Sequence, residues 1–318
     1  MGKKFKGIGC PCVTPFCDDE SVDKINLREL VDFLINSEIN AIIPTSSCGE
    51  PYTLNDAEYQ IIIDTVIDQV NNEVPVYVGL PSESTNRLLK ISKYCIDAGV
   101  DGVVIYPPKI PTISSHELVS HYEFLSSKIE ENILFVNDPD RSGIDLSVEL
   151  IRTISKFPHI VGVVELSSDF KKISQITSEV SDDFLLYTGR GLLVPQAIKE
   201  GGVEGAIVPS ANVVPNLLVE LYEAFNVEMM DRFDELQTKL IPLEIGLKLG
   251  SFPAAIKASL NLLGVKVGNP RKPLSQLSES DLEKLRNILI SVGCLRPPAK
   301  EEEEPPPVEQ NGTKKEVK

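Results

Sequence analysis

Eight short apolar runs recur along this chain, and each is followed by a stretch with the residue pattern of a helix. The run at 160–169 is representative, because its branched apolar residues turn polar at the carboxyl end, as in a strand buried within a parallel sheet. Eight strands alternating with helices predict an α/β fold, a (β/α)8 TIM barrel rather than an open sheet. The predicted strands are 7–16, 41–45, 74–79, 101–106, 133–136, 160–169, 184–188 and 205–208.

The chain divides into three predicted parts. Residues 1–220 form the barrel, and residues 221–295 form a small C-terminal helical appendage of the same unit. Residues 296–318 are acidic, rich in proline and without aromatic side chains, which predicts a disordered tail. The helices that follow the eighth strand are predicted at 216–225, 229–250, 254–263 and 281–291.

Two helix starts carry a recognisable capping pattern. Asn55 is followed three residues later by Glu58, and Ser114 is followed in the same way by Glu117. A short polar residue and a glutamate at this spacing cap each other's backbone amides. We therefore expect one helix to begin at each pair.

The composition excludes several classes of function. A net charge of −16 repels phosphate backbones and anionic lipids, so we expect no nucleic acid and no membrane as partners. No apolar run approaches the roughly 18 to 20 residues of a membrane span, and no secretory segment opens the chain, which predicts a cytoplasmic protein. The six cysteines lack CxxC pairs, so we predict reduced thiols, no metal site at Cys10 and Cys12, and no cofactor.

The segment Ser-Ser-Cys-Gly-Glu at 46–50 resembles the Gly-Thr-Thr-Gly-Glu motif of the dihydrodipicolinate synthase / N-acetylneuraminate lyase family. Members of that family are pyruvate-handling Schiff-base aldolases and lyases built on this barrel. The resemblance extends in collinear order through further positions. They are Thr14-Pro15-Phe16, Asn137, Pro139, Arg141, Gly143, Gly162, Glu165, Gly189, Ser210-Ala211-Asn212, Arg271 and Pro273-Leu274.

The chain departs from the family at the two positions that carry its chemistry. By resemblance, Val164 stands where a lysine ending the sixth strand forms the imine with pyruvate. Val136 stands where a tyrosine on the fifth strand moves protons. A valine has no lone pair for carbinolamine formation, so imine catalysis through position 164 is impossible. Phe135 cannot replace the tyrosine, because it has no hydroxyl and strand alternation directs it to the opposite face.

Two further family positions differ. The threonine pair that holds the substrate carboxylate is replaced by Ser47 and Cys48, and the tyrosine that follows the fourth strand is replaced near Pro108 and Lys109. Lys109 is the best candidate for a relocated amine. Its alternative interpretation is an exposed loop lysine, which we favour because nothing in the sequence indicates the burial that lowers a lysine's pKa.

The anion-binding positions of the family are retained. By resemblance, Arg141 grips the distal carboxylate of the substrate, a role that suits a bidentate guanidinium. We expect the other ligand-binding residues to be Ser47, Cys48, Gly49, Gly189 and Asn212.

The remaining polar residues have open or structural interpretations. Glu165 is predicted to have a structural role, Glu50 to support its own loop, and Lys171 and Lys172 to be solvated. Three charged residues at strand ends depart from the family pattern, and they either remodel the pocket or are only solvated. They are Asp138, Asp140 and Arg190. The three histidines, which we do not predict to be catalytic or to ligate metal, are His116, His121 and His159.

These observations leave two hypotheses. The first is a pseudoenzyme that binds a small 2-oxo acid anion, as a homo-oligomer or as the partner of an active paralogue. The second is a working lyase or aldolase on pyruvate or a related 2-oxo acid, with Lys109 as the amine or without an imine. The resemblance implies a dimer or tetramer in either case.

Overall fold

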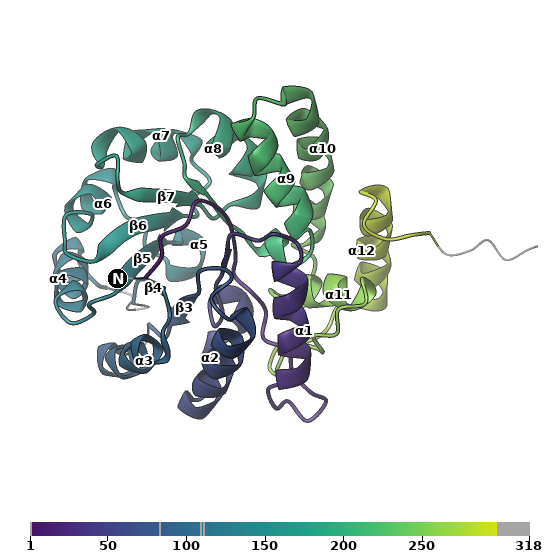
Figure 1. Ribbon diagram of the computed structural model, residues 1–318, viewed down its shortest axis with the longest axis horizontal. Coiled ribbons are helices and arrows are strands. Elements are labelled where there is room, and N and C mark those ends of the chain that lie inside the picture. Colours follow the sequence, from purple (N-terminus) through teal and green to yellow (C-terminus); the bar gives the residue numbers. More distant parts are fainter. Residues whose placement is uncertain (1, 83, 109, 111, 298–318) are drawn as a thin grey trace, which may run out of the picture.

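The strands form the barrel that the sequence predicts. In the computed structural model, which describes residues 2–82, 84–108, 110 and 112–297, eight parallel strands lie in sequence order around one sheet (Figure 1). A parallel bridge between Ile42 and Val76 joins its two edges and nearly closes the ring. The strands are β1 (Gly7–Cys10), β2 (Ala41–Ile42), β3 (Tyr77–Leu80), β4 (Gly102–Ile105), β5 (Asn132–Asn137), β6 (Ile160–Glu165), β7 (Leu185–Thr188) and β8 (Gly205–Ile207).

The predicted first strand is too long. β1 ends at Cys10, because Pro11 and Pro15 cannot donate hydrogen bonds to a neighbouring strand. The chain instead turns at the carboxyl end of the barrel, where Phe16 forms an isolated antiparallel bridge with Val22. The predicted continuation of this strand from Cys10 to Thr14-Pro15 is therefore wrong, and Pro11 instead contributes to the wall of the cavity described below.

Helices surround the strands (Figure 1). Both predicted capping boxes are confirmed, at Asn55 with Glu58 and at Ser114 with Glu117. The short helix α5 follows β5 in a segment for which the sequence indicated no helix. The helices around the barrel are α1 (Lys24–Ile35), α2 (Asp56–Val70), α3 (Thr85–Ala98), α4 (Ser115–Ser126), α5 (Pro139–Ser142), α6 (Val148–Ile154), α7 (Phe170–Glu179), α8 (Val194–Glu200) and α9 (Pro215–Asn226).

The amino-terminal end of the barrel is closed by aromatic side chains. Phe5 stacks on Tyr187 at 4.8 Å between ring centroids and meets Tyr77 edge-on. The Tyr187 hydroxyl donates to the Phe5 carbonyl at 2.5 Å, and the Tyr77 hydroxyl donates to the Lys3 carbonyl at 3.0 Å. Because these side chains fill the amino-terminal end of the barrel, a cavity inside the barrel can open only at the carboxyl ends of the strands.

Three helices follow the barrel: α10 (Met230–Gly246), α11 (Ala254–Leu262) and α12 (Glu279–Ser291). The predicted boundary at 220 falls inside α9, which packs against β1. α10 lies beside α9 and reaches the short helix η3 (Gly191–Leu193) after β7, while α11 contacts η4 (Pro209–Asn212) after β8. The appendage therefore covers part of the carboxyl end of the barrel. The predicted tail falls outside the described residues except for 296 and 297.

Candidate functional site

A cavity of about 160 Å³ lies at the carboxyl ends of the strands. Its deep wall belongs to the barrel interior, and its outer wall is built by the loops that follow β2, β4, β5 and β7 together with the end of α10. A second cavity of about 240 Å³ shares Ser47, Tyr106, Asp138, Arg141 and Phe252 with the first. The carboxyl end of a parallel barrel is where sites of this fold are placed.

Val136 and Val164 face this cavity from adjacent strands. Their Cα atoms are register partners in β5 and β6, and the two residues are 1% and 2% exposed. Phe135 lies on the opposite face, where its ring packs near Tyr122 and Phe184. The predicted orientation of Phe135 is confirmed, and this side chain brings no hydroxyl to the cavity.

The outer wall carries paired charges. The Arg141 guanidinium donates from Nη1 to Asp138 Oδ2 at 3.1 Å and lies over the Phe252 ring at 4.2 Å. Arg190 Nη1 lies 2.8 Å from Asp140 Oδ2. All five residues line the cavity. Asp138, Asp140 and Arg190, whose role could not be decided from the sequence, therefore belong to this cavity. Asp138 is only 3% exposed, so its carboxylate is a fixed partner for the Arg141 guanidinium at the cavity wall.

The loop after β2 contributes Ser46 and Ser47 to the cavity, and the short helix η1 (Ser47–Gly49) begins at Ser47. The Ser47 amide donates to the Tyr106 hydroxyl at 3.3 Å, and burial raises the pKa of Tyr106. Cys48 and Gly49 lie buried behind Ser47, and burial raises the pKa of the Cys48 thiol to about 12. Tyr106 was not identified from the sequence as a residue of the site. Its position at the end of the predicted fourth strand could have indicated it.

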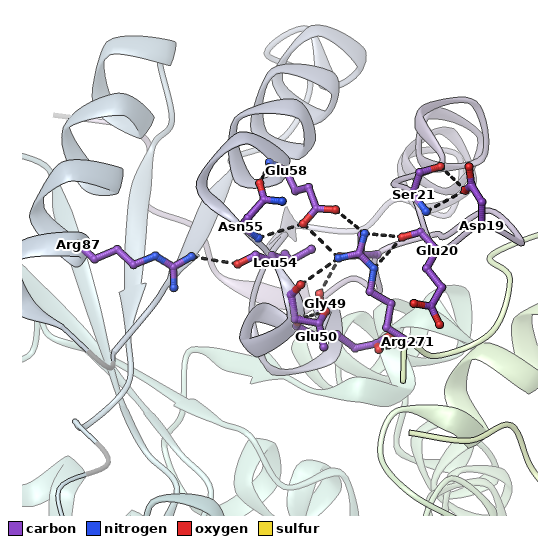
Figure 2. A network of polar contacts seen from close by, with 12 residues as sticks. Asp19, Glu20, Ser21, Gly49, Glu50, Leu54, Asn55, Glu58, Arg87 and Arg271 are labelled. Atoms are coloured by element: carbon purple, nitrogen blue, oxygen red, sulfur yellow. Dashed lines mark hydrogen bonds and ion pairs between the residues drawn. The ribbon is translucent and has the colours of Figure 1, made fainter. Parts of the chain in front are cut away.

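A buried network fixes this loop to the C-terminal appendage (Figure 2). Glu50, which has a left-handed backbone at φ 53° and no exposed surface, pairs through Oε1 with Lys257 Nζ at 2.7 Å. Its Oε2 accepts from the Arg271 amide at 2.9 Å. The Arg271 guanidinium in turn donates to Glu58 at 3.1 Å and to the Glu20 carbonyl at 2.8 Å. Glu50 therefore supports its own loop, as predicted, and through it positions Ser47.

Sequence reasoning also missed Glu244, which enters the cavity from α10. It is 7% exposed, its Oε1 has no hydrogen-bond partner among the described residues, and burial raises its pKa. Gly191 makes room for it, because a Cβ there would lie 1.9 to 2.0 Å from the Glu244 carboxyl group. Lys248, one turn beyond Glu244, lines the same wall and is exposed.

Comparison with known proteins identifies the family. A model of the dihydrodipicolinate synthetase family matches residues 4–291. The chain belongs to this family. It is 34% identical over 297 residues to the 4-hydroxy-tetrahydrodipicolinate synthase of Methanopyrus kandleri, covering 93% of this chain and 99% of that relative.

Solved structures of dihydrodipicolinate synthases share the fold. A chloride-inhibited enzyme from Acinetobacter baumannii complexed with pyruvate has a TM-score of 0.88 at 26% identity, covering 92% of this chain and 100% of that chain. A structure described as the first monomeric dihydrodipicolinate synthase variant has a TM-score of 0.87 at 29% identity. The match covers 92% of this chain and 98% of that chain. The predicted family and fold are both confirmed.

In this dihydrodipicolinate synthetase family member, the predicted binding residues divide into two groups. Ser47, Arg141 and Gly189 line the cavity. Asn212 is fully buried, and its amide accepts from the Val13 amide and donates to the carbonyls of Pro11 and Pro209, each at 3.0 Å. Asn212, like Cys48 and Gly49, therefore lies behind the wall of the cavity rather than in it.

Lys172 is not solvated, so that prediction is wrong. It is 7% exposed, and its ammonium group binds Asp145 and lies 3.5 Å from Glu165 Oε2. Glu165 has no exposed surface and accepts from Asn137 Nδ2 at 2.9 Å and from the Ser167 amide at 2.7 Å. These contacts make Glu165 the centre of a structural network outside the cavity lining. Lys171 is exposed, as predicted.

The remaining candidates lie away from the cavity or cannot be placed. Lys109, the proposed relocated amine, lies outside the described residues. His116 and His121 belong to α4 on the outside of the barrel, and His159 precedes β6 at the opposite end. In the described ranges, no three His, Cys, Asp or Glu side chains are grouped as a metal site requires. None of the helices in those ranges has the length and apolar composition needed to cross a bilayer.

Proposed function

We propose that this dihydrodipicolinate synthetase family member binds a small 2-oxo acid anion without forming a Schiff base. The observation that supports it is the pair of valines, Val136 and Val164, that faces the cavity where the family resemblance places a tyrosine and a lysine. An imine needs an amine with a free lone pair, and a valine supplies none. The chain would then be a pseudoenzyme that keeps its ligand site.

Lys248 does not replace the missing amine. Among the described residues it is the one lysine that lines the cavity, and it is exposed at the rim. Catalytic lysines are activated by burial in an apolar pocket or by a neighbouring cation, which lowers their pKa. An exposed ammonium group is instead suited to attract an anion to the mouth of the cavity.

Arg141 is the residue best placed to hold the ligand carboxylate. In the described structure its hydrogen bond goes to Asp138 through Nη1 at 3.1 Å, and a guanidinium carries five N–H donors. The buried Asp138 carboxylate and the Phe252 ring fix the plane of the guanidinium group. A carboxylate can bind the remaining donors while this support stays in place.

Calorimetric titration with pyruvate tests the proposal. We expect saturable binding to the wild-type protein and about 10- to 150-fold weaker binding to Arg141→Met, since a hydrogen-bonded charge contributes about 1.5 to 3 kcal/mol. Arg152→Met is the matched control, because Arg152 pairs with Glu179 between α6 and α7 and does not line the cavity. No binding to the wild-type protein, or equal binding to both variants, contradicts the proposal.

A second candidate function is a working lyase or aldolase on pyruvate or a related 2-oxo acid. It is favoured by the Tyr106 hydroxyl beside Ser47, which supplies a group able to carry protons at the cavity. Lys109 would be the amine in this account, or the reaction would proceed without an imine. Lyase activity that survives Lys109→Ala undiminished would eliminate the relocated amine.

Assembly and location are part of the same proposal. We expect a cytoplasmic homo-oligomer, or a hetero-oligomer with an active paralogue, by resemblance to the family. A monomeric variant exists among the similar structures, so the fold does not require assembly. Light scattering of the purified protein, together with co-purification from its host, tests the two arrangements.

A further inference from the structure

The deep wall of the cavity is made of aliphatic side chains from five positions around the barrel. Each belongs to the interior cluster and lines the cavity, and their exposed fractions range from 0% to 7%. We call this surface the aliphatic floor. It consists of Ile43, Val104, Val136, Val164 and Ile207.

The charged groups of the cavity come from outside the strands. Asp138, Asp140, Arg141 and Arg190 belong to the segments that follow β5 and β7, and Glu244 and Lys248 come from α10 and the turn after it. The cavity therefore has a charged mouth and an aliphatic interior. A ligand that satisfies both surfaces carries a charged group at one end and a hydrocarbon group at the other.

The cavity is large enough for such a hydrocarbon group. The volume of the whole cavity, charged mouth included, is about 160 Å³, and an apolar cavity of roughly 150 Å³ is enough to bind benzene. Pyruvate places only one methyl group beyond its 2-oxo carbon, so it would leave much of the aliphatic floor uncovered. An uncovered apolar wall contributes nothing to affinity, whereas each buried methylene does.

We infer that the ligand is a monocarboxylate with a branched aliphatic tail of about three to four carbons. Its tail lies on the aliphatic floor, over Val136 and Val164, the positions at which the family resemblance places a tyrosine and a lysine. Its carboxylate binds Arg141. The inference rests on the proposed function and specifies the ligand class for the same cavity. It also gives the two valines a positive role, since they enlarge the apolar surface that selects the tail.

A homologous series of 2-oxo acids tests the inference by calorimetry. Burying one CH2 group strengthens binding about fourfold, so 4-methyl-2-oxopentanoate should bind about 60-fold more tightly than pyruvate, with 2-oxobutanoate and 3-methyl-2-oxobutanoate between them. Affinity that is flat or falls along the series overturns the inference and leaves the proposed function intact. If no member binds, pyruvate included, the proposed function fails as well.

A conservative substitution on the floor separates the tail from the carboxylate. Val164→Thr keeps the side-chain shape but replaces one methyl group by a hydroxyl, and we expect it to weaken 4-methyl-2-oxopentanoate binding about tenfold and pyruvate binding by a smaller factor. Val163→Thr is the matched control, because Val163 is the neighbouring strand residue and belongs to the helix-facing core. Equal effects of the two variants overturn the inference. If Val164→Thr does not fold, Val136→Thr tests the same surface from β5.

Discussion

Replacing Val164 by lysine returns an amine to the position at which the family resemblance places the imine-forming residue. The Val164 side chain is 2% exposed, lines the cavity, and is paired in register with Val136 on one side and Tyr187 on the other. We expect Val164→Lys to form an imine with pyruvate that borohydride traps as a stable adduct. The expectation follows from the desolvation that the aliphatic floor imposes on any amine placed there.

The fraction of unprotonated amine in Val164→Lys follows from the burial of this position. A fully buried lysine has its pKa lowered by up to about 3 to 5 units. At pH 8 an ordinary lysine is roughly 0.4% unprotonated, whereas one shifted by about 3 units is about 80% unprotonated, a gain of about 200-fold in free amine. The folded protein then binds this proton less tightly than the unfolded chain, so the variant gains stability as pH rises from about 7.4 to about 10.4. At neutral pH it should be destabilised by about 4 kcal/mol, which makes pH 8 to 9 the suitable range.

Intact-mass analysis after treatment with pyruvate and borohydride, followed by peptide mapping, measures the result. Val164→Met is the control, since it fills the same site without an amine. A folded Val164→Lys protein that forms no adduct would refute the reasoning, because it would mean that position 164 does not reach the ligand. An adduct that maps to another lysine would refute it equally.

Three further predictions concern the support of the site. Glu50→Gln leaves Lys257, which is 1% exposed, without its anionic partner. Urea titration should therefore show that the free energy of unfolding falls by about 3 to 5 kcal/mol. A decrease below about 1 kcal/mol would contradict the role of this network. Burial raises the pKa of Glu244, so the folded wild-type protein holds this proton more tightly than the unfolded chain and loses stability as pH rises through the raised pKa. Glu244→Gln should remove that loss. Stability curves of the wild-type and variant proteins that run parallel from pH 4 to 8 would contradict this prediction. Gly191→Ala places a methyl group against the Glu244 carboxyl group and should lower thermal stability by about 1 to 3 kcal/mol, which Glu244→Ala in the same chain should partly restore.

Residues at strand ends could be predicted from the sequence, because strand alternation and the order of the strands determine which side chains meet. Val136 and Val164 come together for this reason, and Arg141 lies at the mouth of the same cavity. Lys172 was predicted wrongly although its helix carried the signal. It shares the buried face of α7 with Ile173 and Ile176, and a lysine on that face needs a buried anion, which Asp145 and Glu165 supply.

The contribution of the C-terminal helices could not be predicted in the same way. Glu244 and Phe252 follow the eighth strand by several helical turns, and nothing in their spacing indicates which end of the barrel they cover. Their position depends on the packing of α10 against α9 and on the buried pair of Lys257 with Glu50. Such long-range packing has no local sequence pattern, whereas a strand end has one.

The most direct test of the central claim is the intact mass of the wild-type protein after incubation with pyruvate and borohydride, beside an active family member as control. We predict no adduct on this chain while the control is fully labelled, together with saturable non-covalent binding of 2-oxo acids by calorimetry. A stable single adduct on the wild-type chain would contradict it. Peptide mapping of that adduct to Lys109 would establish the relocated amine instead.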